Sequence, residues 1–339
     1  MAPDSSQSLV IRDSPVCSSC QLVIEQVARL GRPTDLQLIV DRPSVQGLAN
    51  GSYAVSGPGS STAVMRFDSA GRFVEAVGRS GDGPGEFRTI SKIFRLGDDS
   101  LIVVDLGSRR VSVLDSRGRY QRSFAMPFPL QDVAILASGT WLVSGLAYDE
   151  DHIGLPIHRI SSSGEVLQSF GGKVIVAEGR MASAQRILAA RQERVWTASP
   201  VKYELEAWTP TGERRTHLIR QAGWFPSRDF DGSRTHWSIP IHPRLRDLFV
   251  DQAGLLWVMG TVAKEGWQPS PTNWGGIELE DGNLDTVLEV IDPSGQLLVS
   301  RRFPWVATGF TDEGLISSFS VTPDDIIEVR ILRARLTRN

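Results

Sequence analysis

Hydrophobic and polar positions follow one repeating pattern along most of this chain. An apolar strand, a polar turn of the D-x-x-G type and a second apolar strand recur as VMRFDSAGRFVEAVG, VSVLDSRGRYQRSFA, IHRISSSGEVLQSFG, LEAWTPTGERRTHLI and LEVIDPSGQLLVSRRF. The turn glycines are Gly71, Gly118, Gly164, Gly212 and Gly295. The first four follow one another at intervals of 47, 46 and 48 residues, and the fifth comes 83 residues later. A period near 47 residues is typical of one four-stranded propeller blade.

A second repeated marker, a short polar turn followed by a strand, sets the number of blades. It occurs six times, as ANGSYAV, GDDSLIVVD, ASGTWLVS, RQERVWTAS, QAGLLWVM and TDEGLISSF. The last unit ends before its outer strand, whereas residues 21–31 form an alternating strand without a unit of its own. We therefore predict an all-β fold, a single six-bladed β-propeller whose amino-terminal strand completes the carboxy-terminal blade and leaves no sheet edge bare.

The predicted domain organisation is one propeller preceded by a short extension. Residues 1–20 form the extension, which contains the CSSC motif, and residues 21–337 form the propeller. The expected blades are 44–78, 88–125, 131–171, 184–220, 245–303, and 304–337 joined by 21–31. The 83-residue interval is interpreted as one blade that carries extra loops.

Four tryptophans support the same fold. Trp141, Trp196 and Trp257 occupy the second strand of three blades at nearly the same offset from the preceding turn, and Trp208 lies in a third strand. Repeated placement of large aromatic side chains is what packing between blades requires, so we expect these four in the core.

The repeated segments also resemble a known family. VMRFDSAGRFVEAVGRSGDGPGEF, LIVVDLGSRRVSVLDSRGRYQRSF, FVDQAGLLWVM and VLEVIDPSGQLL are similar to the six-bladed, NHL-like propellers of exported bacterial proteins. The resemblance covers most of the chain and implies an extracytoplasmic location, periplasmic or secreted. It implies no catalytic residues.

Composition excludes several partners. The 339 residues carry a net charge of −3, which predicts no general affinity for nucleic acid or for an anionic membrane. No apolar run reaches the ~18 residues that a membrane span needs. The first fifteen residues show no signal peptide, although a leader replaced by a methionine would give the same start. We expect a monomer.

The two cysteines, Cys17 and Cys20, form the motif CSSC. Two thiols cannot complete a tetrahedral zinc site. In an exported chain such a pair suggests a local disulfide, which is the first interpretation; inert thiols and a functional redox pair are the alternatives.

Long connections indicate which face of the propeller carries function. Chain direction alternates along a blade, so the connections between second and third strands share one face with the connections between blades. The segments 145–156, 221–244 and 262–285 are all of these two kinds, and long loops on a rigid scaffold are where binding usually resides. We predict ligand contacts there from the following residues: His152, Trp224, Arg228, Asp229, His236, Trp237, His242, Trp267 and Trp274.

Polar residues at the start of the inner strands are expected to ring the mouth of the central channel. They are Gln46, Asp132, Gln185 and Asp247, and both aspartates occur in similar contexts, QDVAI and RDLFV. A water-filled structural lining is the first interpretation. The alternative is a divalent cation, calcium or magnesium, with Asp132 and Asp247 as candidate ligands.

The glycine-rich stretch GRSGDGPGEF, residues 78–87, lacks the glycine order and the following helix of a phosphate-binding loop. We interpret it as the crossover from one blade to the next, with Phe87 anchoring the next inner strand. Asp82 and Glu86 are the residues of this stretch that would border a pocket.

The sequence favours an exported binding protein. Its partner would be a small molecule, a glycan or a protein, held on the face with the long loops. The alternative is a metal-dependent hydrolase or lyase of the lactonase kind at the channel mouth of that face. A structural module of a larger envelope assembly is a third possibility, and no motif identifies a catalytic residue.

Overall fold

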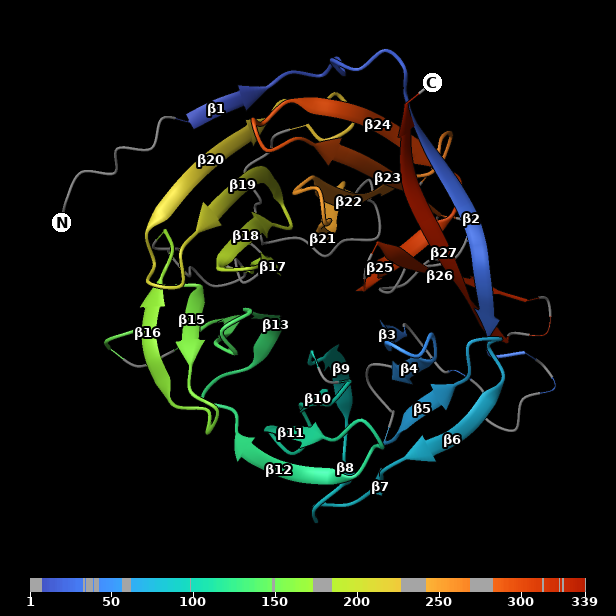
Figure 1. Cartoon of the computed structure of the whole chain (residues 1–339), viewed down its shortest axis with the longest axis vertical. Helices are drawn as coiled ribbons and strands as arrows, with labels where there is room; N and C mark the ends of the chain where they lie inside the picture. The colour runs from blue at the N-terminus through green and yellow to red at the C-terminus, as the bar shows by residue number, and fades with distance from the viewer. Residues whose placement is uncertain are drawn as a thin grey trace. The chain divides into compact units, whose positions relative to one another are not determined.

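The computed structural model consists of β-strands. It describes residues 8–32, 34, 39, 43–56, 62–97, 99–147, 150–172, 185–226, 242–268, 283–312, 314–322, 324 and 326–338. The chain divides into two compact units, unit 1 with residues 1–22, 130–306 and 337–339, and unit 2 with residues 23–129 and 307–336. Each unit contains three sheets built on the four strands that the repeat predicts; in unit 1 one of these sheets has a fifth strand, and unit 2 has an additional two-stranded pair (Figure 1).

Unit 1 contains three successive sheets, and their neighbouring strands in chain order are antiparallel. The first consists of β13 (Leu130–Ile135), β14 (Trp141–Gly145), β15 (Ile157–Ile160) and β16 (Val166–Phe170). The second consists of β17 (Ile187–Arg191), β18 (Arg194–Ser199), β19 (Lys202–Trp208) and β20 (Arg214–Arg220). The third consists of β21 (Arg244–Val250), β22 (Leu256–Ala263), β23 (Leu284–Ile291) and β24 (Leu297–Phe303).

Unit 2 contains the other three sheets. The first consists of β3 (Ser44–Gly47), β4 (Tyr53–Ser56), β5 (Val64–Phe67) and β6 (Phe73–Val77). The second consists of β9 (Ile90–Arg95), β10 (Leu101–Asp105), β11 (Arg110–Leu114) and β12 (Tyr120–Ala125). The third has the order β2 (Cys20–Leu30), β27 (Ile327–Arg338), β26 (Leu315–Val321) and β25 (Val306–Asp312), so its outer strand comes from the amino-terminal part of the chain.

The repeated turns use one hydrogen-bonding scheme. In the turn at Asp68, the carboxylate accepts the main-chain N–H groups of Ala70 and Arg72. The same pattern occurs at Asp115 and Asp292. A side-chain oxygen that replaces a main-chain acceptor closes the turn, which explains why Asp begins it. The five turn glycines have φ between 77° and 88°, a conformation in which glycine avoids the strain of a Cβ atom.

Gly71 gives a test of this turn, with Gly139 as its matched control. Both have a φ of 79°, but an added Cβ would lie 2.2 Å from the main-chain oxygen of Arg29 at Gly71 and would meet nothing within 4 Å at Gly139. We expect Gly139→Ala to cost about 1 to 2 kcal/mol of unfolding free energy through backbone strain alone. Gly71→Ala should cost at least about 1 kcal/mol more, since the turn must also move. Urea denaturation measures both, and equal losses would contradict the packing against Arg29.

The predicted tryptophans lie in the core. Trp141, Trp196 and Trp257 are buried on β14, β18 and β22, the second strands of their sheets, and Trp208 is buried on β19. The prediction from their repeated spacing is therefore confirmed.

One strand of unit 1 was not predicted. Residues 8–11, within the expected extension, form β1 (Ser8–Ile11), which pairs in parallel with β20 as a fifth strand. Ile11 is buried in the adjoining core, whereas Leu9 and Val10 are about half exposed. Beyond it, the N–H of Val16 donates to the carbonyl of Leu297 at 2.9 Å. The extension thus follows the outer strands β20 and β24.

The glycine-rich stretch lies between β6 and β9, as predicted, and contains a short parallel pair, β7 (Arg79–Ser80) and β8 (Glu86–Phe87). Phe87 is fully buried and fills the space that a side chain at Gly78 would need. Glu86 accepts the main-chain N–H of Gly83, and Asp82 pairs with Arg88. Glu86 and Asp82 therefore bind within or next to their own loop.

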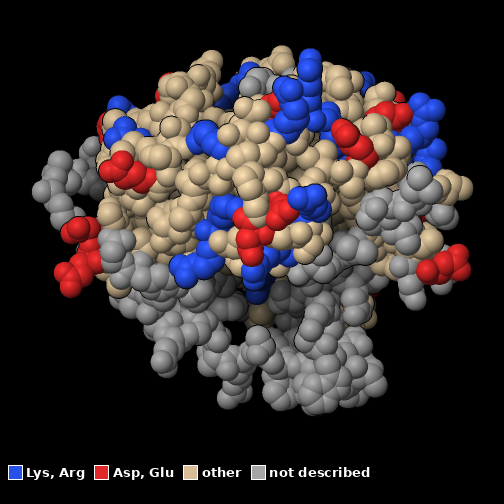
Figure 2. All heavy atoms as spheres, turned by 90° about the horizontal axis from the view of Figure 1, so that it is seen from below, with Lys and Arg blue, Asp and Glu red and all other residues tan. Residues whose placement is uncertain are grey.

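On the side of the molecule that Figure 2 presents, basic and acidic side chains lie beside one another.

Asp105, the last residue of β10, binds the main chain where the glycine-rich crossover ends. Its buried carboxylate accepts the main-chain N–H groups of Thr89, Arg88 and Ser108 and the hydroxyl of Ser108. Burial raises the pKa of Asp105, but these hydrogen bonds more than offset it, so the pKa lies below its usual 3.8.

The pKa of Asp105 is lower in the folded state than in the unfolded state. The carboxylate therefore stabilises the fold fully at pH values above its unfolded pKa, and this stabilisation is lost as pH falls through its folded pKa. We expect Asp105→Asn to lower the unfolding free energy at pH 7 by about 1 to 3 kcal/mol. The variant should also lose less stability than the wild type below about pH 4. Urea denaturation at pH 7 and at pH 3 measures both effects, and a parallel loss in the two proteins would contradict this role.

Candidate functional site

The long connections of unit 1 start and finish at one end of its sheets. They are the segments 146–156 between β14 and β15, 221–243 between β20 and β21, and 264–283 between β22 and β23. Ser144 pairs with Ile157 and Ala263 with Leu284, so two of these connections leave the same end of their sheets as the starts of β13 and β21. The N–H of Leu245 donates to the carbonyl of Pro200 at 2.9 Å, which joins the ends of neighbouring sheets. We call this the loop-bearing end.

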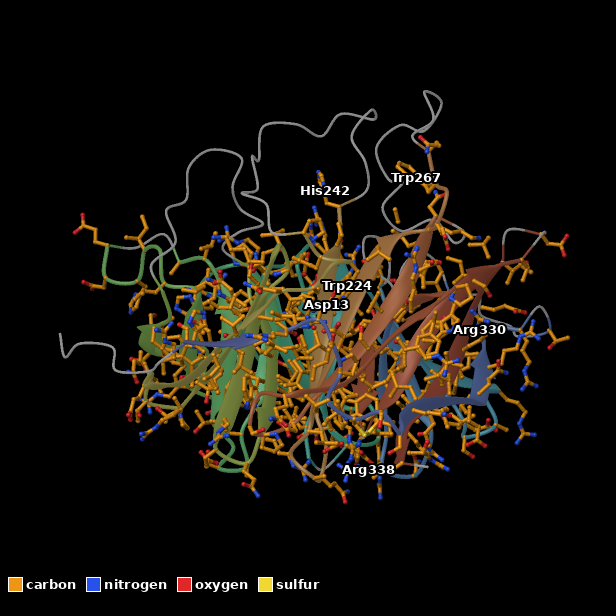
Figure 3. The ribbon with its side chains drawn as sticks, turned by 90° about the horizontal axis from the view of Figure 1, so that it is seen from above. Asp13, Trp224, His242, Trp267, Arg330 and Arg338 are labelled. Atoms are coloured by element: carbon orange, nitrogen blue, oxygen red, sulfur yellow. A yellow bond between two sulfur atoms is a disulfide. The ribbon has the colours of Figure 1, made fainter. Side chains whose placement is uncertain are left out.

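Three of the predicted ligand contacts lie at this end among the described residues. Figure 3 shows His242 and Trp267 at one end of unit 1. His152 lies in the connection after β14, where its ring is 6.5 Å from that of His158 and inclined by 72° to it. His158 was not predicted; it is fully buried, and its ring nitrogens contact Ser169 Oγ at 2.6 Å and the Gly145 carbonyl at 3.3 Å.

Five predicted contacts fall outside the described residues: Arg228, Asp229, His236, Trp237 and Trp274. Their roles stay predictions.

Trp224, the remaining predicted contact, takes part in packing. Its indole N–H donates to Glu289 at 2.9 Å, and its ring lies against Tyr203 and Phe225 at centroid distances of 5.6 and 5.4 Å. An added Cβ at Gly260 would lie 2.5 Å from its six-membered ring, so the glycine makes room for the indole. Contact of Trp224 with a ligand stays a prediction.

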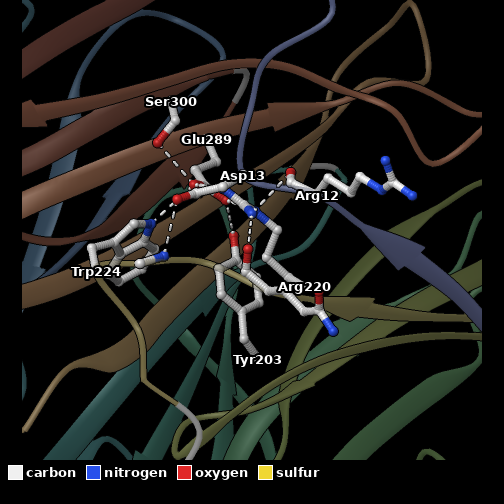
Figure 4. A network of polar contacts seen from close by, with 9 residues as sticks. Arg12, Asp13, Tyr203, Arg220, Trp224, Glu289 and Ser300 are labelled. Carbon is white, nitrogen blue, oxygen red and sulfur yellow. Dashed lines mark hydrogen bonds and ion pairs between the residues drawn. The ribbon is translucent and has the colours of Figure 1, made fainter.

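Glu289 of β23 is the centre of a buried polar network (Figure 4). One carboxylate oxygen accepts Arg220 Nη2, Trp224 Nε1 and Ser300 Oγ at 2.8 to 2.9 Å. The other accepts Arg220 Nε at 2.9 Å and the hydroxyl of Tyr203 at 2.6 Å. Burial and the neighbouring carboxylate raise the pKa of Tyr203, so the phenol stays protonated and donates.

Arg220 connects this network to the amino-terminal segment. Besides Glu289, its guanidinium donates to the carbonyls of Arg12 and Gln221 and to the carboxylate of Asp13. Its side chain is completely buried, as is that of Glu289. A buried ion pair stabilises only when its remaining donors and acceptors are satisfied, which is the case here.

Breaking this pair should be costly. Glu289→Gln removes the buried anion of Arg220 and leaves it only the largely exposed carboxylate of Asp13, so we expect a loss of about 3 to 5 kcal/mol of unfolding free energy. Glu213→Gln is the control, since Glu213 pairs with Arg215 on the surface of the same unit and should contribute less than about 1 kcal/mol. Guanidinium denaturation compares the unfolding free energies of the two variants, and similar losses would show that the buried pair contributes no more than the surface pair.

Two of the predicted channel-mouth residues, Asp132 and Gln46, connect neighbouring inner strands. Asp132 Oδ2 accepts the N–H of Leu188 on β17 at 2.9 Å, and its Oδ1 accepts the N–H of Val133 at 3.1 Å. In unit 2, Gln46 accepts the N–H of Arg95 on β9 at 3.3 Å. Asp247 Oδ1 accepts the N–H of Leu248 at 2.8 Å. The side chains of Asp132 and Gln46 thus supply hydrogen bonds between neighbouring sheets, whereas the Asp247 bond lies within its own strand.

Gln185, the fourth predicted mouth residue, precedes β17, and its carbonyl accepts Arg186 Nη1 at 2.9 Å. No group of three His, Cys, Asp or Glu side chains with metal-binding geometry occurs among the described residues. Asp132 and Asp247 therefore stay predictions as ligands of a calcium or magnesium ion. Cys17 and Cys20 form a disulfide, which was the first of the three interpretations.

Sequence reasoning missed the residues that precede the two aspartates. In β13, Leu130 pairs with Gly145 and Asp132 with Ser144, so Gln131 is the extra residue of a β-bulge. In β21, Leu245 pairs with Gly260 and Asp247 with Met259, so Arg246 is the extra residue at the equivalent place. The matching contexts LQDVAI and LRDLFV contained this signal, because both carry a long polar side chain before the aspartate.

Comparisons with known proteins confirm the fold. Residues 49–186 match the DUF5128 family model, described as 6-bladed beta-propeller. A candidate exported protein of Bacteroides fragilis is 11% identical, with a TM-score of 0.66, and the alignment covers 97% of this chain and 100% of that one. A DUF4221 family member of Bacteroides vulgatus is also 11% identical, with a TM-score of 0.67 and coverages of 95% and 99%.

An enzyme shares the fold more distantly. Virginiamycin B lyase of Staphylococcus aureus, solved as an inactive variant with quinupristin, is 8% identical, with a TM-score of 0.51 and coverages of 92% and 99%. No curated protein matches the sequence. No helix among the described residues has the length and apolar character to span a membrane. The chain is thus a six-bladed β-propeller, and its resemblance to such propellers is confirmed.

Proposed function

We propose that this protein is an exported binding protein that holds its ligand or partner at the loop-bearing end of unit 1. The observation that carries the proposal is the contrast between the two ends of the unit. The opposite end has tight turns that are closed by their own side chains, as at Ser161, Thr209, Asp251 and Asp292. The loop-bearing end has the connections 146–156, 221–243 and 264–283.

Side-chain chemistry at this end supports binding. Trp267 and His242 lie there, and Trp305 follows β24 at the same end, stacked against Phe303 at a centroid distance of 5.2 Å. Partly exposed aromatic rings on a rigid scaffold supply large contact areas at a low entropic cost. The rigidity comes from the buried network around Glu289, which fixes the chain up to Phe225.

An export location agrees with two observations. The chain contains a disulfide, which persists in oxidising compartments. One of the similar structures is that of a candidate exported protein. We therefore place the binding function outside the cytoplasm.

The test is a ligand screen with variants of both ends. Thermal shift screening against a library of sugars, small acids and peptides identifies ligands that raise the melting temperature. We expect Trp267→Ala and His242→Ala to weaken a genuine ligand about tenfold or more, measured by calorimetric titration, because interface aromatics carry much of the binding energy. Gln252→Ala, on the exposed turn between β21 and β22 at the opposite end of unit 1, is the control and should leave affinity unchanged.

A ligand that loses affinity in Gln252→Ala, but not in the two loop-bearing variants, would place the site at the opposite end of unit 1 and refute the proposal. The alternative, a metal-dependent hydrolase or lyase, stays a prediction.

A further inference from the structure

The β-bulges of unit 1 put unusual side chains at the loop-bearing end. Among the first strands, β17 lies next to both β13 and β21, and the fourth strands β16, β20 and β24 lie outside (Figure 1). Gln131 and Arg246 occupy equivalent bulges near the start of β13 and β21. A bulge redirects its extra side chain away from the regular ladder and often lies beside a functional site. We call Gln131, Arg186, Arg244 and Arg246 the inner-strand mouth.

The two aspartates of this region bind the main chain. Both oxygens of Asp132 accept main-chain N–H groups, one of them from the neighbouring sheet, and one oxygen of Asp247 accepts the N–H of Leu248. Each aspartate therefore has a structural role, and Glu206 and Glu204 are further acids that act on Arg186.

The cations are held in place and partly removed from water. Arg246 Nε donates to Thr261 Oγ1 at 2.9 Å, which fixes the direction of its guanidinium. Arg186 and Arg244 are half-buried at the starts of β17 and β21, and burial lowers the pKa of Arg186. A guanidinium that the protein already orients and partly desolvates loses less on binding a carboxylate than a mobile one does.

Gln131 adds a hydrogen-bond acceptor. Its Oε1 is buried and has no hydrogen-bond partner among the described residues. A buried acceptor without a donor costs about 1 to 3 kcal/mol, and a ligand that supplies the donor recovers this cost.

We propose that the inner-strand mouth binds a small sugar acid or hydroxy acid. Its carboxylate pairs with the guanidinium groups of Arg246 and Arg186, and a hydroxyl group donates to Gln131 Oε1. This inference rests on the proposed function, since the mouth belongs to the loop-bearing end, and it names the chemical class of the ligand. It also assigns an anion to a region for which the sequence suggested a cation.

The test is calorimetric titration of the full chain with D-glucuronate and D-galacturonate, each compared with its parent hexose. We expect saturable binding of at least one uronate and at least about tenfold weaker binding of the parent sugar, which lacks the charged group. Arg246→Gln should weaken the uronate about tenfold or more. Arg191→Gln is the control, because Arg191 is a half-buried arginine at the opposite end of β17 and its loss should leave affinity unchanged.

Gln131→Met separates binding from folding. If the orphaned acceptor exists for a ligand, the variant should bind the uronate more weakly and have an equal or higher melting temperature, since an unsatisfied polar atom has been removed. A lower melting temperature with unchanged affinity would assign Gln131 to the fold and overturn its role here.

Two further outcomes would overturn the inference. One is the absence of uronate binding in the wild type, and the other is equal affinity for uronate and parent sugar. A neutral ligand that depends on Trp267 and His242 would leave the proposed function standing while this inference fails. If no ligand bound at the loop-bearing end, both the proposed function and this inference would be refuted.

Discussion

The buried pair of Arg220 and Glu289 is the constraint on which the rest of unit 1 depends. Two charges with no exposed surface must satisfy every donor and acceptor they carry. Here that requirement brings together β20, β23, Trp224 and the main chain at Arg12, because each supplies a partner that the others cannot. The chain that continues toward the loop-bearing end therefore starts from a fixed point.

The fold was predictable because its signals are local and repeated. Asp68, Asp115 and Asp292 close their turns with bonds to residues two and four positions later, so the reason for each turn lies within five residues of sequence. The buried Trp141, Trp196 and Trp257 recur at nearly the same offset from the preceding turn, which is also a local and repeated signal. By contrast, β1 is four residues long, pairs in parallel and depends on a partner 209 residues away, and nothing in SLVI itself indicates that pairing.

The candidate site was only partly predictable. The lengths of the connections identified the loop-bearing end, but not the surroundings of any side chain in it. Trp224 occurs in a loop-like sequence, and its partner Glu289 follows 65 residues later within an apolar strand, so sequence distance concealed the contact. Gln131 and Arg246 were missed because a bulge depends on the register of two strands, which one strand's sequence does not contain.

The repeated bulge has a consequence for how such a scaffold changes. In β9, Ser91 is the extra residue between the pairs of Lys92 and Ile90, at the position that Gln131 and Arg246 occupy in unit 1. Their side chains have separate partners: Ser91 donates to the carbonyl of Val104, and Arg246 donates to Thr261. Serine, glutamine and arginine thus occupy the same bulge while the strand pairs on either side of it stay intact. The bulge is therefore a position on the inner strand where side-chain length and charge differ between blades, and specificity can change there without a change in the ladder.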